Sequence, residues 1–295
     1  RALSMSRNNI KIGVILQGAE TPFMKEVLKG IQEACAEVDN LGGTVLVHKI
    51  EHQNAEDVIL AMEKMRMEEV RGIAMVPLDE ERVKREIDRF VEEFRIPVVT
   101  FTSDVEDTKR LCFVGQNGVQ CGRAAAGLMG ELTGGKGKVA VISGYSTNTS
   151  LSSRVVGFRE EIARKYPGIE IIGPEYCFEE NGRAREITEG IFKDVPDLDG
   201  IYLTSHGEEG VCEAIAGAGK AGRVKMVAND FMGRNYELMR EGFIHFLIGQ
   251  DARIQGYEPV MILFRLLFNG EAPERAKIFT EIYIRNEYTI PEGRH

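Results

Sequence analysis

The sequence lacks the local motifs that mark the common nucleotide-binding and hydrolytic enzymes. It contains no Gly-x-Gly-x-x-Gly, no Gly-x-Ser-x-Gly and no His-Glu-x-x-His. A dinucleotide site, a hydrolase nucleophile and a zinc protease helix are therefore not indicated. The glycine-rich stretch 130–136 resembles part of a P-loop, but Gly137 stands where Ser or Thr is required and a strand follows instead of preceding it. No nucleophile–base pair can be assembled, so we expect neither an enzyme nor a cofactor.

Cysteine is scarce and scattered. The five cysteines are Cys35, Cys112, Cys121, Cys177 and Cys212. No Cys-x-x-Cys or mixed Cys/His spacing occurs among them, so neither a disulfide framework nor a zinc site is indicated. His48 and His52 are spaced four apart without a carboxylate motif, which favours a surface pair over a metal site. Unpaired cysteines of this kind favour a reducing, cytoplasmic location.

Long apolar runs and excess positive charge are also absent. No stretch approaches the length of a membrane span, and residues 1–9 lack the apolar core and cleavage pattern of a signal peptide. The net charge of −9 argues against a broad nucleic-acid-binding surface in this segment. The chain starts without methionine, so we expect it to be a fragment of a longer protein, although a cleaved secreted form would start in the same way.

Short apolar strands alternate with amphipathic helices along the whole chain. The first strand, 10–16, is followed by a break and by a helix from Pro22, for which Thr21 is the expected N-cap. Further strands are expected at 44–50, 72–77, 97–101, 111–115, 138–142, 169–172, 200–203, 225–228, 243–248 and 279–284. Strict alternation at short intervals predicts doubly wound parallel sheets. Because the two halves repeat this pattern, we predict two α/β lobes with a ligand cleft between them.

Polar residues recur where predicted strands end and helices begin, which is where open α/β sheets bind ligands. The short list comprises Gln17, Phe23, Thr102 to Asp104, Gln116, Asn117, Tyr145, Arg154, Thr204 to His206, Asn229 to Phe231, and Gln250. Arg, Asp, Asn and Gln suit vicinal sugar hydroxyls, and Phe or Tyr suits the apolar face of the ring. For each residue the alternative is helix capping or surface solvation. Their recurrence at successive strand ends is what favours a ligand site.

Several short motifs, in this order and spacing, resemble the sugar-binding core shared by LacI-type transcriptional regulators and ribose-binding-type periplasmic proteins. They are Ile12–Ile15 with Thr21–Phe23, Phe113–Asn117 with Gly122-Arg123, Ser153–Phe158, Ala228–Asp230 and Ile248–Asp251. The resemblance runs from about Lys11 to Arg285. It implies the type I fold of periplasmic binding proteins, with three chain crossings between lobes, near Gln116, Gln250 and Thr280. The implied lobes are 10–116 with 251–279, and 117–250 with 280–290, while 1–9 is the end of a hinge or linker.

The resemblance also implies roles for single residues. Phe23 matches an aromatic residue that packs on the sugar, Arg154 an arginine that grips hydroxyls, and Asp230 a carboxylate that accepts from them. Asn117 and Gln250 match polar residues at crossings. The expected ligand-binding residues are Gln17, Thr21, Phe23, Thr102, Asp104, Asn117, Tyr145, Arg154, Thr204, His206, Asp230 and Gln250. Thr21, Thr102-Ser103 and Thr204-Ser205 depart from the ribose-binding pattern, so a different ligand is expected.

Residues 1–9 resemble the end of the hinge helix of LacI-type regulators. The leading hypothesis is therefore the effector-binding core of a cytoplasmic repressor. It binds a small neutral sugar or polyol, forms a homodimer, and reaches operator DNA only through a missing helix-turn-helix domain. The alternative is the solute-binding receptor of a sugar ABC transporter, which uses the same pocket as a monomer. An α/β enzyme is the weakest hypothesis, since no catalytic pair is found.

Arg154 carries the most weight in this interpretation. Its planar guanidinium suits two adjacent hydroxyls, and Asp230 or Asp104 is expected to balance its charge. We expect it in the first turn of its helix, from which it can point into the cleft, and the alternative role is that of a solvated helix residue. On that view Arg154→Lys weakens ligand binding and leaves folding nearly unchanged.

Overall fold

The computed structural model describes residues 10–293 and divides them into two compact α/β units. Unit 1 comprises 10–116 and 251–280, and unit 2 comprises 117–250 and 281–293. The chain passes from one unit to the other after Gln116, Gln250 and Thr280. The linker expected at 1–9 lies outside the described residues. Among residues 10–293, no helix has the length and apolar character needed to cross a bilayer.

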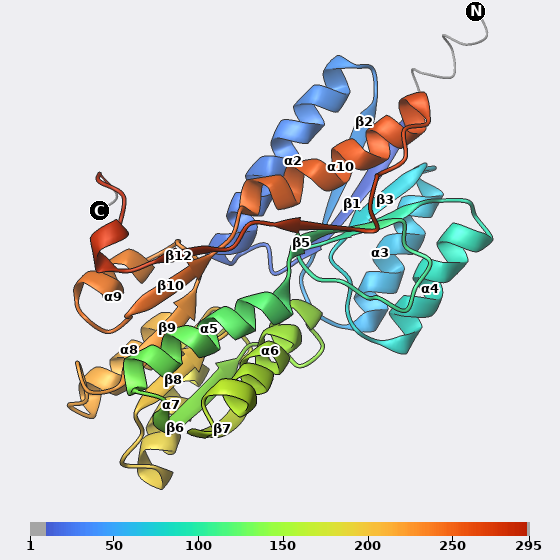
Figure 1. Ribbon diagram of the computed structural model, residues 1–295. Coiled ribbons are helices and arrows are strands. Elements are labelled where there is room, and N and C mark those ends of the chain that lie inside the picture. The colour runs from blue at the N-terminus through green and yellow to red at the C-terminus, as the bar shows by residue number, and fades with distance from the viewer. Residues whose placement is uncertain (1–9, 294–295) are drawn as a thin grey trace, which may run out of the picture. The chain divides into compact units, whose positions relative to one another are not determined.

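Unit 1 is a six-stranded, wholly parallel sheet with helices on both faces (Figure 1). Its strands, in the spatial order β11-β5-β4-β3-β1-β2, are β1 (Lys11–Gln17), β2 (Thr44–Ile50), β3 (Gly72–Met75), β4 (Val98–Phe101), β5 (Cys112–Gln116) and β11 (Lys277–Thr280). Its helices are α2 (Pro22–Asn40), α3 (Ala55–Met67), α4 (Glu81–Glu92) and α10 (Ala252–Asn269). Helices α2 and α10 pack side by side, and α3 and α4 share the other apolar core.

Unit 2 repeats this arrangement with one antiparallel edge strand. Its strands, in the order β12-β10-β9-β8-β6-β7, are β6 (Lys136–Ser143), β7 (Gly168–Tyr176), β8 (Gly200–Leu203), β9 (Lys225–Asn229), β10 (Phe246–Gly249) and β12 (Tyr283–Arg285). Its helices are α5 (Gly118–Thr133), α6 (Thr149–Lys165), α7 (Asn181–Asp194), α8 (Glu208–Gly217), α9 (Asn235–Arg240) and the 3-10 turn η1 (Glu287–Thr289). Helices α5 and α6 cover one face, and α7 and α8 the other. The predicted α/β class with two parallel-sheet lobes is confirmed.

The largest differences from the predicted strands lie at three places. The run 279–284 is two strands: β11 pairs in parallel with β5, and β12 pairs antiparallel with β10 in the other sheet. No Gly or Pro marks the break between them, so the sequence indicates one strand. The strand expected at 243–248 starts only at Phe246. The strand expected at 169–172 continues to Tyr176, because β7 is an edge strand that accommodates Pro174 beside a register shift.

Each unit has a helix pair in which glycines on both helices allow the two backbones to touch. In unit 2, a methyl group added at Gly122 of α5 would lie 2.0 Å from the carbonyl oxygen of Arg154 in α6. A methyl group at Gly157 of α6 would lie 2.0 Å from the carbonyl oxygen of Val119 in α5. The contact is reciprocal, so both glycines are required for α6 to lie at this depth.

Unit 1 uses the same device between α2 and α10 (Figure 1). A methyl group at Gly30 would lie 2.0 Å from the carbonyl oxygen of Arg253, and one at Gly256 would lie 2.0 Å from that of Val27. A change of side-chain conformation cannot relieve an overlap with backbone atoms. An alanine at any of these four positions must therefore push the helices apart.

This packing leads to a prediction with a control on the same helix. Gly122→Ala should lower the free energy of unfolding by about 3 kcal/mol, since overpacking against backbone costs about 1–3 kcal/mol or more. Gly127→Ala, also in α5, adds a methyl group with nothing within 4 Å. It should raise the free energy of unfolding by about 0.5–1 kcal/mol, because alanine is the better helix former. Urea titration of both variants tests this, and equal effects would contradict the packing described.

Candidate functional site

The carboxyl-terminal edge of the unit 1 sheet carries five of the expected ligand residues. Gln17 ends β1, is 5% exposed, and donates from Nε2 to the carbonyl of Val76 at 2.8 Å. Its Oε1 is buried and has no hydrogen-bond partner among residues 10–293. Thr21 caps α2 by accepting from the N–H of Met24 at 3.3 Å. Phe23 lies in the first turn of α2 and is partly exposed.

Thr102 and Asp104 follow β4 at the same edge. Thr102 has a left-handed backbone, with φ of 59°. The Asp104 carboxylate accepts from Arg110 Nε and Nη2 at 2.5 and 2.6 Å and from the Thr100 hydroxyl at 2.8 Å. Both members of the Asp104–Arg110 pair are nearly buried. Within unit 1, the Asp104 carboxylate is therefore paired with Arg110.

Arg154 lies in α6 of unit 2 and is only 4% exposed. Its Nη1 donates to the carbonyl oxygen of Thr204, just after β8. The expectation that Arg154 lies in the first helical turn is wrong, and so is the alternative of a solvated helix residue. Helix α6 begins at Thr149, capped by Asn148, so Arg154 lies in the second turn and faces the sheet. A buried guanidinium is costly unless it is hydrogen-bonded and matched by a negative charge.

Asp230 is an acidic residue that acts electrostatically on Arg154. It follows β9 in a left-handed conformation, with φ of 75°, and its Oδ1 accepts from Gln250 Nε2 at 3.3 Å. Its carbonyl accepts from Asn235 Nδ2 at 2.9 Å, which fixes the turn. Burial raises the pKa of Asp230, while the positive charge of Arg154 and the Gln250 hydrogen bond oppose that rise. Three expected residues, Arg154, Asp230 and Gln250, are thus brought together.

His206 forms an ion pair that the sequence did not predict. Its Nδ1 lies 2.9 Å from Oε2 of Glu208, and the Glu208 carboxylate is nearly buried. Glu208 also accepts from the N–H of Gly207 at 3.0 Å and from Asn235 Nδ2 at 3.1 Å. The hydrogen bond to Glu208 raises the pKa of His206, and burial opposes that rise. His206 therefore stays protonated to a higher pH than a free histidine.

The remaining expected residues of unit 2 are held by local contacts. The Thr204 hydroxyl donates to Ser143 Oγ at 2.7 Å at the ends of β8 and β6. The Tyr145 ring packs against Phe178, with centroids 5.5 Å apart. Asn117 caps α5 by accepting from the N–H of Gln120 at 3.1 Å, so capping accounts for its side chain.

Glu179 was missed by the sequence analysis. It lies just beyond β7, and burial raises the pKa of its carboxyl to about 7. The charges of His206 and Arg154 lower that pKa, whereas those of Glu208 and Asp230 raise it further. The predicted strand ended at Ile172, four residues short of the true end of β7, so the residues after Tyr176 were not considered as strand-end residues.

Backbone strain occurs at these same strand ends. Within residues 10–293, four of the six non-glycine residues with positive φ, Thr102, Phe178, Glu179 and Asp230, follow β4, β7 or β9, whereas Glu69 and Arg95 precede β3 and β4. Such conformations cost roughly 1 kcal/mol or more each and tend to cluster at functional sites. This distribution points to the carboxyl-terminal edges of the sheets as functional surfaces.

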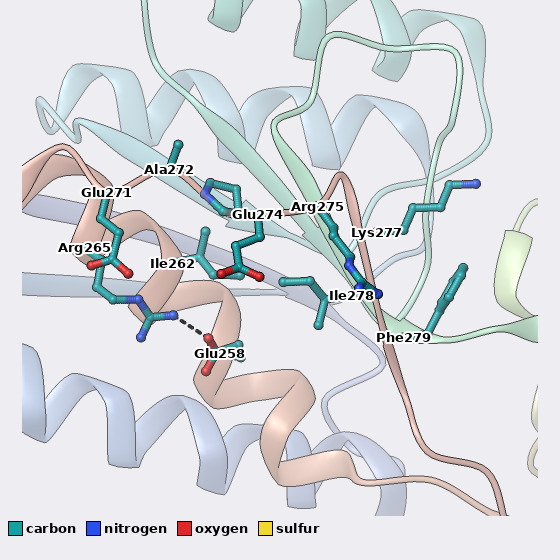
Figure 2. Close-up of a pocket in the computed structure, with 11 residues that line it drawn as sticks. Glu258, Ile262, Arg265, Glu271, Ala272, Glu274, Arg275, Lys277, Ile278 and Phe279 are labelled. Carbon is teal, nitrogen blue, oxygen red and sulfur yellow. Dashed lines mark hydrogen bonds and ion pairs between the residues drawn. The ribbon is translucent and has the colours of Figure 1, made fainter.

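One pocket in unit 1 is a different feature. It has a volume of about 600 Å³ and lies between α10 and the segment leading into β11 (Figure 2). Its wall contains Arg265, paired with Glu258, and Lys277, paired with Glu106 outside the pocket. Because these charges are already matched and the pocket flanks the edge strand, it is not our candidate site.

Within residues 10–293 no group of three or more His, Cys, Asp or Glu side chains is placed to hold a metal ion.

Comparison with known families shows what class of protein this fold and site define. Residues 12–272 match the periplasmic binding protein domain family, and the chain belongs to it. The chain is 23% identical, over 81% of its length and 78% of the relative's, to the D-allose-binding periplasmic protein of Escherichia coli. It is 25% identical to the D-ribose/D-allose-binding protein of Pseudomonas aeruginosa, over 74% and 70% of the two chains. The crystal structure of a glucose-galactose binding protein from Geobacillus stearothermophilus superposes with a TM-score of 0.88, at 23% identity, over 96% and 99% of the two chains.

These findings correct the leading hypothesis. The relatives are sugar-binding proteins named as periplasmic or solved as transport receptors, not LacI-type regulators. The expectation of a transcription regulator is wrong, and so is the expected cytoplasmic location. The comparisons give no support to operator DNA or a homodimer as partners. The error arose from residues 1–9 and from the cysteines, because the ligand-binding core itself resembles both branches.

The His206–Glu208 pair yields a pH-dependent stability prediction. Because the folded-state pKa of His206 is raised above the unfolded value, its stabilisation is fully present below about pH 6.5 and is lost as pH rises through the folded pKa. His206→Gln should therefore destabilise the protein more at pH 6 than at pH 9. Urea unfolding at both pH values measures this, with His48→Gln as a control outside the pair. A difference between wild type and His206→Gln that is independent of pH would contradict it.

Proposed function

We propose that this protein is the solute-binding receptor of a sugar ABC transporter and that it binds a small neutral sugar. The observation that carries the proposal is Arg154, buried at the carboxyl-terminal edge of the unit 2 sheet and electrostatically matched by Asp230. A guanidinium and a carboxylate set side by side suit neighbouring sugar hydroxyls, which both donate and accept. The names of the relatives, which bind allose, ribose, glucose or galactose, support this class of ligand.

Electrostatics favour a neutral ligand over a sugar phosphate. Two carboxyl groups, those of Asp230 and Glu179, act electrostatically on Arg154. A phosphate dianion would have to approach these carboxylates with one arginine to hold it, whereas phosphate sites usually supply several cations or backbone N–H groups. A neutral sugar or polyol avoids this repulsion.

We infer a location outside the cytoplasm, with the transporter's membrane subunits as the partner. The relatives named as periplasmic support this. The five free cysteines are compatible with it, because four are buried and burial raises the pKa of the Cys112 and Cys177 thiols to about 11. A protonated, inaccessible thiol reacts slowly with oxidants, so free cysteine does not require a reducing compartment.

The function is tested first by thermal unfolding with D-allose, D-ribose, D-glucose and D-galactose, and with ribose 5-phosphate for comparison, each at 10 mM. A sugar that binds only the native state raises the melting temperature. We expect at least one of the four to do so, with no change in the sugar after prolonged incubation. If none raises the melting temperature, or if ribose 5-phosphate alone does, the proposed function is wrong.

Arg154 is tested with the sugar that gives the largest shift. Arg154→Lys should weaken binding by about 1–3 kcal/mol, because lysine cannot present two donors in one plane. It should also lower the melting temperature, since Arg154 is buried and bonded to Thr204. Arg164→Lys, an exposed change on the same helix, is the control and should leave the affinity unchanged. Calorimetry showing equal affinities for both variants would place the site elsewhere.

A further inference from the structure

An unsatisfied hydroxyl lies beside Glu179. Ser205 is 4% exposed, and its Oγ has no hydrogen-bond partner among residues 10–293. A methyl group placed on Gly144 would meet Ser205 Oγ at 2.8 Å and Glu179 Cγ at 2.8 Å. The two side chains therefore flank the same point at the end of β6, which only a glycine leaves open. Buried hydroxyl groups normally form a hydrogen bond, so Ser205 Oγ is expected to bond a polar group that is not part of the protein.

The Glu179 side chain lies at the same place and is partly exposed. Burial and nearby charges act on its carboxyl. Its backbone is fixed: the N–H of Phe178 donates to the carbonyl of Gly144 at 3.1 Å, and that of Glu180 to the carbonyl of Cys177 at 3.0 Å. Two successive residues, Phe178 and Glu179, hold left-handed conformations there. The fold thus accepts strain to hold the Glu179 side chain near Ser205.

Charged groups from several elements act on Glu179. They are His206 and Glu208 from the start of α8, Asp230 from the end of β9 and Arg154 from α6. The Tyr145 phenol is also close enough for Glu179 to raise its pKa, together with burial. Burial outweighs the two cations, which leaves the Glu179 carboxyl with a pKa of about 7 and half protonated near neutral pH. A new hydrogen bond to this carboxyl therefore changes its protonation.

We propose that Glu179 and Ser205 together bind one hydroxyl group of the sugar, and that sugar binding is thereby coupled to proton release. The sugar O–H donates to a Glu179 oxygen, and Ser205 Oγ donates to the sugar oxygen. Where Glu179 is protonated in the free protein, its proton passes to solvent when the sugar binds. The inference rests on the proposed function and adds a specificity-determining pair to it.

The sign of the pH effect follows from the hydrogen bond. A donor that contacts the carboxylate lowers its pKa, so in the complex Glu179 titrates below its free value of about 7. Affinity should rise as pH increases from 6 to 8 and level off above that. The gain is at most about tenfold for each unit by which the sugar lowers the pKa.

The experiment is titration calorimetry between pH 5.5 and 8.5 with whichever of the four sugars gives the largest thermal shift. Two buffers of different ionisation enthalpy at pH 7 count the protons released. Wild type should release a fraction of one proton and bind roughly tenfold more tightly at pH 8 than at pH 6. Glu179→Gln should remove the proton release and most of this pH dependence. Ser205→Ala should weaken binding by about fivefold at pH 8.

Glu180→Gln is the matched control, since Glu180 is the next residue, is exposed and makes no capping hydrogen bond with its side chain. It should behave as wild type. If a sugar binds but Glu179→Gln keeps the full pH dependence and proton release, the inference is wrong while the proposed function stands, and His206 becomes the titrating group. If no sugar raises the melting temperature, the proposed function itself fails. Melting temperatures of the variants without sugar show that each is folded.

Discussion

The candidate site depends on the close approach of α5 and α6. The backbone atom that packs against Gly122 is the carbonyl oxygen of Arg154 itself. The depth at which α6 lies against α5 therefore sets the position of the arginine relative to the end of the sheet. A larger residue at Gly122 or Gly157 would displace the guanidinium from Thr204 as well as weaken the helix pair. Stability and ligand recognition are coupled at this point.

A buried arginine imposes requirements on its surroundings. It needs an acceptor, which Thr204 provides through its carbonyl, and a counter-charge, which Asp230 provides. Asp230 in turn needs a strained turn and the Asn235 amide to hold it. Electrostatics and backbone strain at the carboxyl-terminal edge of unit 2 are thus two aspects of one arrangement, in which each polar group is fixed by the next.

Much of the fold was predictable from the sequence, because alternating apolar strands and amphipathic helices leave few architectures open. The order of the elements and the parallel sheets follow from periodicity alone. The ends of strands were harder to predict from the sequence. Because β7 continues through Pro174, Glu179 was not recognised as a residue near a strand end. The run 279–284 shows why periodicity cannot reveal a change of sheet, since an apolar residue facing one sheet looks like an apolar residue facing another.

The site residues divide in the same way. Thr21 and Asn117 lie where expected, but their side chains cap helices. Position in the chain alone could not decide between helix capping and ligand binding. Arg154 was predicted as a site residue, but its burial was not predicted. The burial of a side chain depends on how its helix packs and not on residue type alone. The ion pair between His206 and the Glu208 carboxylate can be recognised only from the three-dimensional structure around the start of α8. Pairings of this kind depend on contacts between elements distant in sequence.

The discontinuity of unit 1 has a consequence for the order in which the protein assembles during synthesis. Helix α2 emerges from the ribosome early, but its glycine-lined partner α10 and the edge strand β11 are translated only after nearly all of unit 2. Until then the face of α2 that carries Gly30 has no neighbour. Unit 2, by contrast, waits only for the edge strand β12 and the short segment after it. Translation therefore favours the second half of the chain as the first to reach its final packing.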